Sequence, residues 1–160
     1  MHIIAAKAVC FKEALQPEFK EYQKQVLKNS KALSSEFANL GYRIVARGTD
    51  THLFLLDLTN KNITGKDAAT VLDRANITVN KNLIPYDTKS PFVASGVRIG
   101  SPAITTRGMK EAEMRKVARL IDRVISDPQN EVNINAVRAD VKSLTKKFPL
   151  YKNLVKRMEK

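Results

Sequence analysis

The chain has 160 residues, of which 28 are Lys or Arg and 16 are Asp or Glu, so its formal net charge is +12. Hydrophobic residues make up 43% of the chain and Gly and Pro contribute six residues each, which excludes collagen-like and intrinsically disordered compositions. No apolar run approaches the roughly 20 residues that a membrane-spanning helix needs. The single cysteine, Cys10, excludes an intramolecular disulfide and favours a reducing compartment, for which the cytoplasm is the simplest expectation.

The positive charge is concentrated toward the C-terminus. Residues 107–160 carry 14 basic and 7 acidic side chains, so this third supplies more than half of the net charge. Such a balance is compatible with nucleic acid, an anionic membrane surface or small anionic ligands, and equally with a solvated, lysine-rich surface. Nucleic acid is the weaker expectation, because the chain has no Trp and no aromatic pairs interleaved with Arg on which bases could stack.

The first 41 residues predict two consecutive helices. Apolar side chains recur at helical spacing from the first turn with no capping residue ahead of them, namely Ile4, Ala8, Phe11 and Leu15. We therefore expect the chain to begin inside a helix, on which Cys10 is packed rather than catalytic. Pro17 restarts the helix, and Gly41 is expected to end it in a left-handed conformation. The apolar stripe between them consists of Phe19, Tyr22, Val26, Leu33, Phe37 and Leu40.

The middle of the chain predicts short strands around one helix. Residues 42–47 and 52–58 are rich in β-forming residues and flank a polar turn, which is typical of an antiparallel hairpin. Thr64 can cap a helix over 65–75. Residues 76–79 and 97–100 are predicted as strands, and residues 80–95, which contain two prolines, as a long irregular segment of the kind that often carries function.

The C-terminal part predicts two helices and a basic tail. One helix is expected to start near Gly108 and Glu111 and to stop at Asp127 and Pro128, and a second spans about 130–147. The order of elements predicts an α+β fold, with helices packed on a small, mostly antiparallel sheet.

Common catalytic and metal-binding signatures are absent from the sequence, and three polar features stand out instead. The amides of Asn80 and Asn82 follow a predicted strand and suit recognition of a heterocycle edge. Ser90, Pro91 and Phe92 place a rigid apolar ring beside a hydroxyl. Arg98 projects from an otherwise apolar strand, where its guanidinium needs either a ligand carboxylate or an internal salt bridge to Asp or Glu.

These residues resemble, in order and spacing, the C-terminal part of bacterial serine hydroxymethyltransferase. The resemblance covers essentially all 160 residues but only about the last two-fifths of that family's chain. One departure is Arg47, which stands where the family usually has a second glycine before Gly48 and Thr49. The matching motifs are residues 2–9, 11–15, 48–53, 79–82, 90–93, 95–100, 105–108 and 147–151.

The resemblance implies the small C-terminal domain of an aminotransferase-like chain, a fold type I pyridoxal phosphate enzyme. That family interconverts serine plus tetrahydrofolate with glycine plus 5,10-methylenetetrahydrofolate, and its dimer shares active sites across the interface. By resemblance, Arg98 binds the carboxylate of the amino-acid substrate and Asn82 contacts the pterin of the folate. Ser90, Pro91 and Phe92 border the folate site, whereas His52 is structural.

The segments that carry the family's Schiff-base lysine and the aspartate partner of the pyridine nitrogen are not among these 160 residues. The resemblance therefore implies no catalytic residue, no cofactor-binding residue and no metal site in this chain, which we expect to be inactive alone. Residues 1–41 are expected to continue from a missing large domain, and residues 42–160 to form the small domain. Two other hypotheses stay open: a stand-alone basic interaction or RNA-binding module, and a dimerisation module.

Overall fold

The computed structural model describes residues 1–151, so the predicted basic tail lies outside the described residues. These residues form six helices and a four-stranded antiparallel sheet with the strand order β1-β2-β4-β3, and helices pack on the sheet, which confirms the predicted α+β class. The helices are α1 His2–Ala14, α2 Pro17–Asn39, α3 Gly65–Arg74, α4 Pro102–Thr106, α5 Glu111–Ser126 and α6 Glu131–Lys147. The strands are β1 Arg43–Ile44, β2 Leu53–Asp57, β3 Asn80–Asn82 and β4 Gly96–Gly100.

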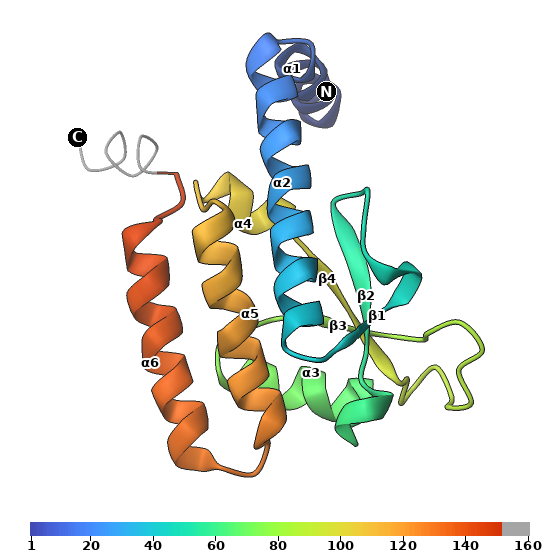
Figure 1. The fold of residues 1–160 in the computed structure, drawn as a ribbon. Coiled ribbons are helices and arrows are strands. Elements are labelled where there is room, and N and C mark those ends of the chain that lie inside the picture. The colour runs from blue at the N-terminus through green and yellow to red at the C-terminus, as the bar shows by residue number, and fades with distance from the viewer. Residues whose placement is uncertain (152–160) are drawn as a thin grey trace.

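The sheet is buried on one face. Alternation along β2 and β4 directs Phe54, Leu56, Val97 and Ile99 to the same side, where all four are buried. Helices α2, α5 and α6 lie side by side on this side, and α3 crosses at one end of them (Figure 1). The core therefore lies between the helices and one face of the sheet. The opposite face is open around Arg98 but covered at Asp57, which has no exposed surface.

The predicted apolar faces of the longer helices are largely confirmed. Val26, Leu33 and Phe37 of α2 are buried, whereas Phe19, nearer the start of the same stripe, is 38% exposed. On α5 the buried side chains include those expected from the helical spacing: Met114, Ala118, Ile121, Val124 and Ile125. The starts of α3 and α6 also agree with the prediction. The side chains of Thr64 and Asn130 accept backbone N–H groups there and cap the two helices.

The first strand of the predicted hairpin is shorter than expected. Residues 43 and 44 pair with β2, but Val45–Arg47 form a single turn of 3-10 helix. Ala46 and Arg47 adopt positive φ angles of 62° and 59°, which stop the strand. A glycine at position 47 would adopt this left-handed conformation at lower cost than Arg47 does.

The prediction of a strand over 76–79 followed by an irregular segment from 80 is wrong by a few residues. Asn76 takes a positive φ of 61°, and the N–H of Ile77 donates to the carbonyl of Leu72, so these residues close the end of α3. The strand is instead β3, because only residues 80–82 reach β4 to pair with it. Local propensity could not locate this pairing.

A short helix, α4, precedes α5 and was not predicted. Gly108 has a φ of 90° and separates the two helices, so α5 begins at Glu111 rather than at Gly108. The carboxylate of Glu113 accepts the backbone N–H of Lys110 and caps the new start. The predicted stop holds, since α5 ends at Ser126, just before Asp127 and Pro128.

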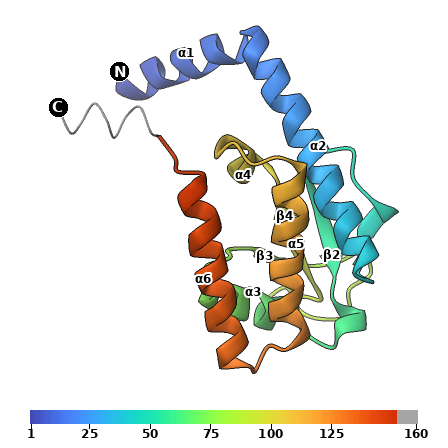
Figure 2. The same cartoon turned by 60° about the vertical axis from the view of Figure 1, so that its left-hand side comes forward.

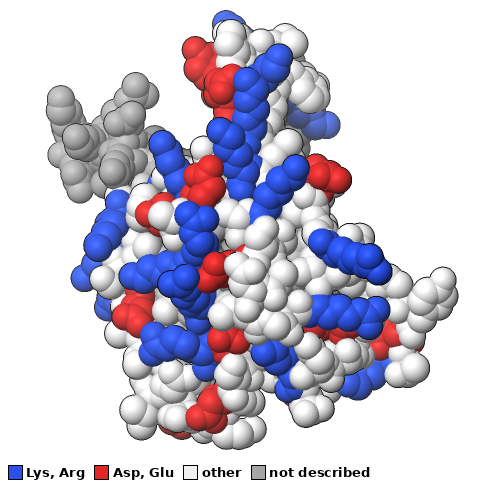
Figure 3. Space-filling model, in the orientation of Figure 1, with Lys and Arg blue, Asp and Glu red and all other residues white. Residues whose placement is uncertain are grey.

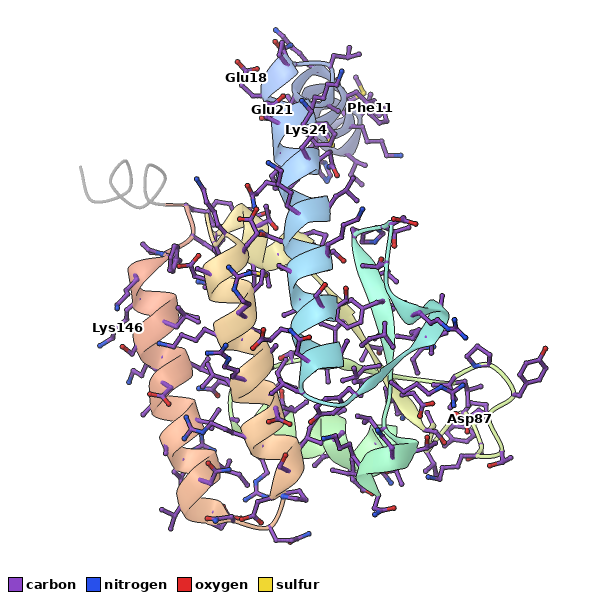
Figure 4. All side chains as sticks on the ribbon, viewed as in Figure 1. Phe11, Glu18, Glu21, Lys24, Asp87 and Lys146 are labelled. Carbon is purple, nitrogen blue, oxygen red and sulfur yellow. The ribbon has the colours of Figure 1, made fainter. Side chains whose placement is uncertain are left out.

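Helix α1 projects away from the rest of the domain. It leaves α2 at a wide angle beyond the end of the sheet, and its residue Phe11 lies far from the core (Figures 2 and 4). None of its residues is buried, so the expectation that Cys10 is packed is wrong for this structure. Within residues 1–151, no helix combines the length and apolarity needed to cross a membrane.

Buried polar side chains join α2 to the segments that follow β4. The amide of Asn29, which has no exposed surface, donates to the hydroxyl of Thr105 at 2.8 Å and to the carbonyl of Met109 at 2.9 Å. The hydroxyl of Ser101 donates to the carbonyl of Val26 at 2.7 Å. These bonds align α4 and the start of α5 on α2.

Another polar link joins the start of the sheet to α5. The hydroxyl of Tyr42 donates to the carboxylate of Asp122 at 2.9 Å, while its ring packs edge-on against Phe37. Burial, together with this hydrogen bond, raises the pKa of Tyr42 far above its usual value. Tyr42 is therefore a neutral donor at neutral pH.

We predict that Asn29→Ala lowers the free energy of unfolding by about 1–3 kcal/mol, because the carbonyl of Met109 would lose its buried donor. Urea unfolding followed by circular dichroism measures the change. Gln23→Ala, at an exposed position of the same helix, is the matched control and should leave stability within about 0.5 kcal/mol. Equal stability of the two variants would contradict a structural role for the Asn29 amide.

Candidate functional site: the open face of the sheet

Arg98 lies on the open face of the sheet, in the centre of β4. In the antiparallel register it is opposite Leu55 of β2 on one side and Asn80 of β3 on the other. Its neighbours Val97 and Ile99 are buried on the core face, so the strand that holds Arg98 is itself anchored in the core. The backbone of this residue is thus fixed while its side chain is exposed to solvent.

Ion pairing distinguishes Arg98 from the other guanidinium on this face. Arg43 lies 3.1 Å from a carboxylate oxygen of the buried Asp57, whereas Arg98 forms no ion pair within residues 1–151. An internal salt bridge was one of the two alternatives for Arg98 in the sequence analysis. It is not formed among the described residues. Its guanidinium can donate hydrogen bonds to a carboxylate from outside the described residues.

A shallow depression surrounds Arg98 at one edge of the sheet. Neither Lys nor Asp nor Glu belongs to its lining in the described part of the chain, so Arg98 is the charged group there. The depression is closed on one side by the start of α4. The lining residues are His52, Leu53, Thr78, Val79, Asn80, Arg98, Gly100, Pro102 and Ala103.

Asn82 lies on the same face of the sheet as Arg98, on the neighbouring strand β3. It is opposite Gly96, two residues from Arg98, which makes Asn82 and Arg98 diagonal neighbours across β3 and β4. Its side-chain amide donates to the carbonyl of Leu83 at 2.8 Å. The amide oxygen points to no protein donor within the described residues, so it can accept a hydrogen bond from a ligand.

Ser90, Pro91 and Phe92 belong to the loop over residues 83–95, which connects β3 to β4. None of the three lines the depression around Arg98. The loop projects beyond the sheet on the side away from α5 and α6 (Figure 1). Ser90 begins a tight turn, since its carbonyl accepts the N–H groups of Val93 and Ala94. The ring of Phe92 is 80% exposed on this turn and is free to contact another molecule.

Asp87 lies in this loop (Figure 4), and its carboxylate accepts four hydrogen bonds from loop residues. One carboxylate oxygen accepts the N–H of Lys89 at 2.9 Å and the hydroxyl of Ser95 at 2.7 Å. The other accepts the N–H of Ser95 at 2.8 Å and that of Ile84 at 3.2 Å. Desolvation opposes the charged form, but these hydrogen bonds outweigh it and lower the pKa of Asp87 to about 2.

The loop is also held by the first turn of α3. The N–H groups of Gly65 and Lys66 donate to the carbonyls of Ala94 and Val93, both at 2.9 Å, so loop carbonyls bind otherwise unpaired donors of the helix. Gly65 permits this contact because a Cβ at that position would overlap the carbonyl oxygen of Gly96. The start of α3 and the loop therefore form one packed unit.

Sequence patterns identified some members of this site and missed others. Arg98 was conspicuous as a charge in an apolar strand, and Asn82 as one of two amides in a short run. Thr78 and His52 lie beside Arg98 only because β2, β3 and β4 pair, which a one-dimensional pattern does not contain. The role of Asp87 could have been predicted from the sequence. An Asp in a loop often accepts the backbone N–H two residues later and so stabilises a turn, as Asp87 does with Lys89.

Charges over the helical layer do not form a single basic patch. Figure 3 shows Lys and Arg side chains on this face interspersed with Asp and Glu. Ion pairs account for part of this pattern, such as those of Arg119 with Glu36 and Arg123 with Asp140. Among residues 1–151, no group of three or more His, Cys, Asp or Glu side chains is arranged to hold a metal ion.

Comparison with known families identifies a match over most of the chain. The family model described as serine hydroxymethyltransferase matches residues 1–121, which is most of the chain and includes every residue of the open face discussed above. The match also includes α1, α2 and the loop over 83–95. The chain belongs to the serine hydroxymethyltransferase family.

Proposed function

We propose that these 160 residues form the C-terminal part of a cytoplasmic serine hydroxymethyltransferase, which transfers a one-carbon unit between serine and tetrahydrofolate. The observation that carries this proposal is the exposed Arg98, held on a core-anchored strand without an ion-pair partner among the described residues. Such a guanidinium fits a ligand that carries a carboxylate. The family membership of residues 1–121 supports an amino acid as that ligand.

In this proposal Arg98 binds and orients the carboxylate of serine or glycine. A guanidinium and a carboxylate are both planar and can form two parallel hydrogen bonds, which fixes the direction of the bound amino acid as well as its position. Neighbouring Asn80 and Thr78 contribute polar groups to the same depression. The role of Arg98 is therefore substrate orientation and not proton transfer, since an arginine keeps its charge at ordinary pH.

The folate would lie toward Asn82 and the loop over 83–95. Asn82 has an amide oxygen available to accept a hydrogen bond from a pterin, and Phe92 presents an exposed ring next to Ser90 and Pro91. Because Asn82 and Arg98 share one face of the sheet, the two substrates would meet on that face. This arrangement suits a reaction that moves one carbon between them.

Pyridoxal phosphate is the family's cofactor, and the described residues do not fit it by themselves. A Schiff-base lysine and an acidic partner for the pyridinium are what make this cofactor an electron sink. Neither Lys, Asp nor Glu lines the depression around Arg98 in residues 1–151, and Lys81 lies in register with the buried Val97 on the other face. We infer that the chain alone orients substrates and is not catalytic.

Helix α1 supports the proposal that residues 1–41 continue from a large domain into the small domain of residues 42–160. Nine of its 13 residues are apolar, yet none is buried, and Ile4 and Phe11 are 65% and 67% exposed. So high a proportion of exposed apolar residues is typical of a helix that another part of a protein covers. We propose that the large domain, within a homodimer, covers α1 and closes the open face of the sheet.

A nucleic-acid-binding module is the weaker alternative. On the face that Figure 3 shows, acidic groups are interspersed among the basic ones, whereas a continuous basic stripe would be expected for binding to a phosphate backbone.

We predict that the 160-residue chain mixed with pyridoxal phosphate gives no visible absorption band beyond that of adventitious lysine adducts. An unrelated protein at equal lysine concentration serves as the reference, because surface lysines react weakly with the aldehyde. A saturable band that exceeds the reference and is quenched by serine would contradict the inference that the chain lacks the cofactor site.

We predict that Arg98→Lys raises the KM for serine about a hundredfold, because a lysine keeps the charge but cannot form the paired hydrogen bonds. The measurement uses a chimaera in which these 160 residues replace the matching part of a complete serine hydroxymethyltransferase. Arg115→Lys, at an exposed position of α5, is the matched control and should behave as the unmodified chimaera does. An unchanged KM for serine in the Arg98 variant, beside an active unmodified chimaera, would refute the assigned role.

A further inference from the structure

The loop over residues 83–95 is long, yet the carboxylate of Asp87 connects its first half, which leaves β3, to its last residue, which precedes β4. Asp87 lies on the limb that leaves β3, and Ser95 lies where the other limb enters β4. Both the backbone N–H and the hydroxyl of Ser95 donate to the Asp87 carboxylate, at 2.8 and 2.7 Å. The loop is thus closed across its base by side-chain contacts in addition to the strand pairing.

The same carboxylate holds the residues on either side of the exposed turn. Lys89, directly before Ser90, donates its N–H to Asp87, and Ser95 follows the turn that Ser90 begins. The carbonyl of Ser95 accepts the N–H of Leu58, just beyond β2, at 3.0 Å. Asp87 therefore connects the turn over 90–92 to the rigid sheet, although its own side chain does not form the surface of that turn.

The geometry requires a carboxylate and not merely a polar side chain. Each of the two oxygens of Asp87 accepts two hydrogen bonds, one pair from Lys89 and Ser95 and the other from Ser95 and Ile84. An asparagine would present one oxygen and one NH2 group, so two of the four donors would face another donor. The isosteric substitution Asp87→Asn should therefore disrupt the loop without creating a cavity.

We propose that Asp87 is a positioning residue for the folate subsite: its carboxylate fixes the loop so that Ser90, Pro91 and Phe92 meet the folate in one orientation. This inference rests on the proposed function, because the loop is assigned to folate there. Asp87 acts through the turn and does not itself touch the substrate. The low pKa of Asp87 agrees with this role, since the carboxylate remains ionised at neutral and mildly acidic pH.

The first experiment measures loop order in the 160-residue chain. Amide hydrogen exchange of Lys89 and Ser95 should accelerate at least tenfold in Asp87→Asn, while amides of the core strand β4 keep their protection. Asp73→Asn, an identical chemical change at an exposed position of α3, should leave the loop amides unchanged. Unaltered exchange of Ser95 in Asp87→Asn would overturn the positioning role.

The second experiment measures function in the chimaera described above. Asp87→Asn should raise the KM for tetrahydrofolate about tenfold, with kcat and the KM for serine within about twofold of the unmodified chimaera. Ser95→Ala, which removes one of the four hydrogen bonds, should give an intermediate KM. A merely structural role would instead lower the yield of folded enzyme without separating the two KM values.

The outcomes separate this inference from the proposed function. An unmodified chimaera without hydroxymethyltransferase activity would refute the proposed function, whatever the behaviour of the loop. An active chimaera in which Asp87→Asn loosens the loop but leaves the KM for tetrahydrofolate unchanged would refute the inference alone.

Discussion

The antiparallel pairing of β2 with β4 is the interaction on which the rest of the structure depends. Five residues of each strand are in register, and alternation sends Val97 and Ile99 into the core and Arg98 to the open face. Burial of the two apolar neighbours therefore fixes the backbone of the charged residue between them. The same pairing places Asn80 and Asn82 of β3 beside Arg98, because β3 joins the free edge of β4.

The two faces of the sheet have different physical roles. One is covered by α2, α5 and α3 and accounts for the core, with polar links such as those of Asn29 and Tyr42 aligning the helices. The other carries Arg98, Asn82 and a depression whose charge comes from Arg98 alone among the described residues. The division leaves polar side chains exposed around Arg98 on a core-anchored strand, as the proposed role in substrate orientation requires.

The helices could be predicted closely from the sequence, and the strands less so. The boundaries of α2, α3 and α6 follow from Pro17, Thr64 and Asn130, since a restart or a cap depends on neighbours within one turn. The strand over 76–79 was misplaced because a three-residue strand is defined by its partner, and β4 lies more than a dozen residues further along the chain. The exposure of Cys10 was also unpredicted, because helical spacing indicates an apolar face without indicating whether anything covers it.

The sequence by itself determined the composition class, the α+β order of elements, the family resemblance and the presence of Arg98 as a charge in an apolar strand. These properties are local, or depend on residue identity and spacing along the chain. Only the tertiary structure decided that Arg98 has no ion-pair partner among residues 1–151, that Asn82 shares its face, and that Asp87 joins both limbs of the loop. These properties depend on strand pairing and loop closure, which bring together groups that the chain separates.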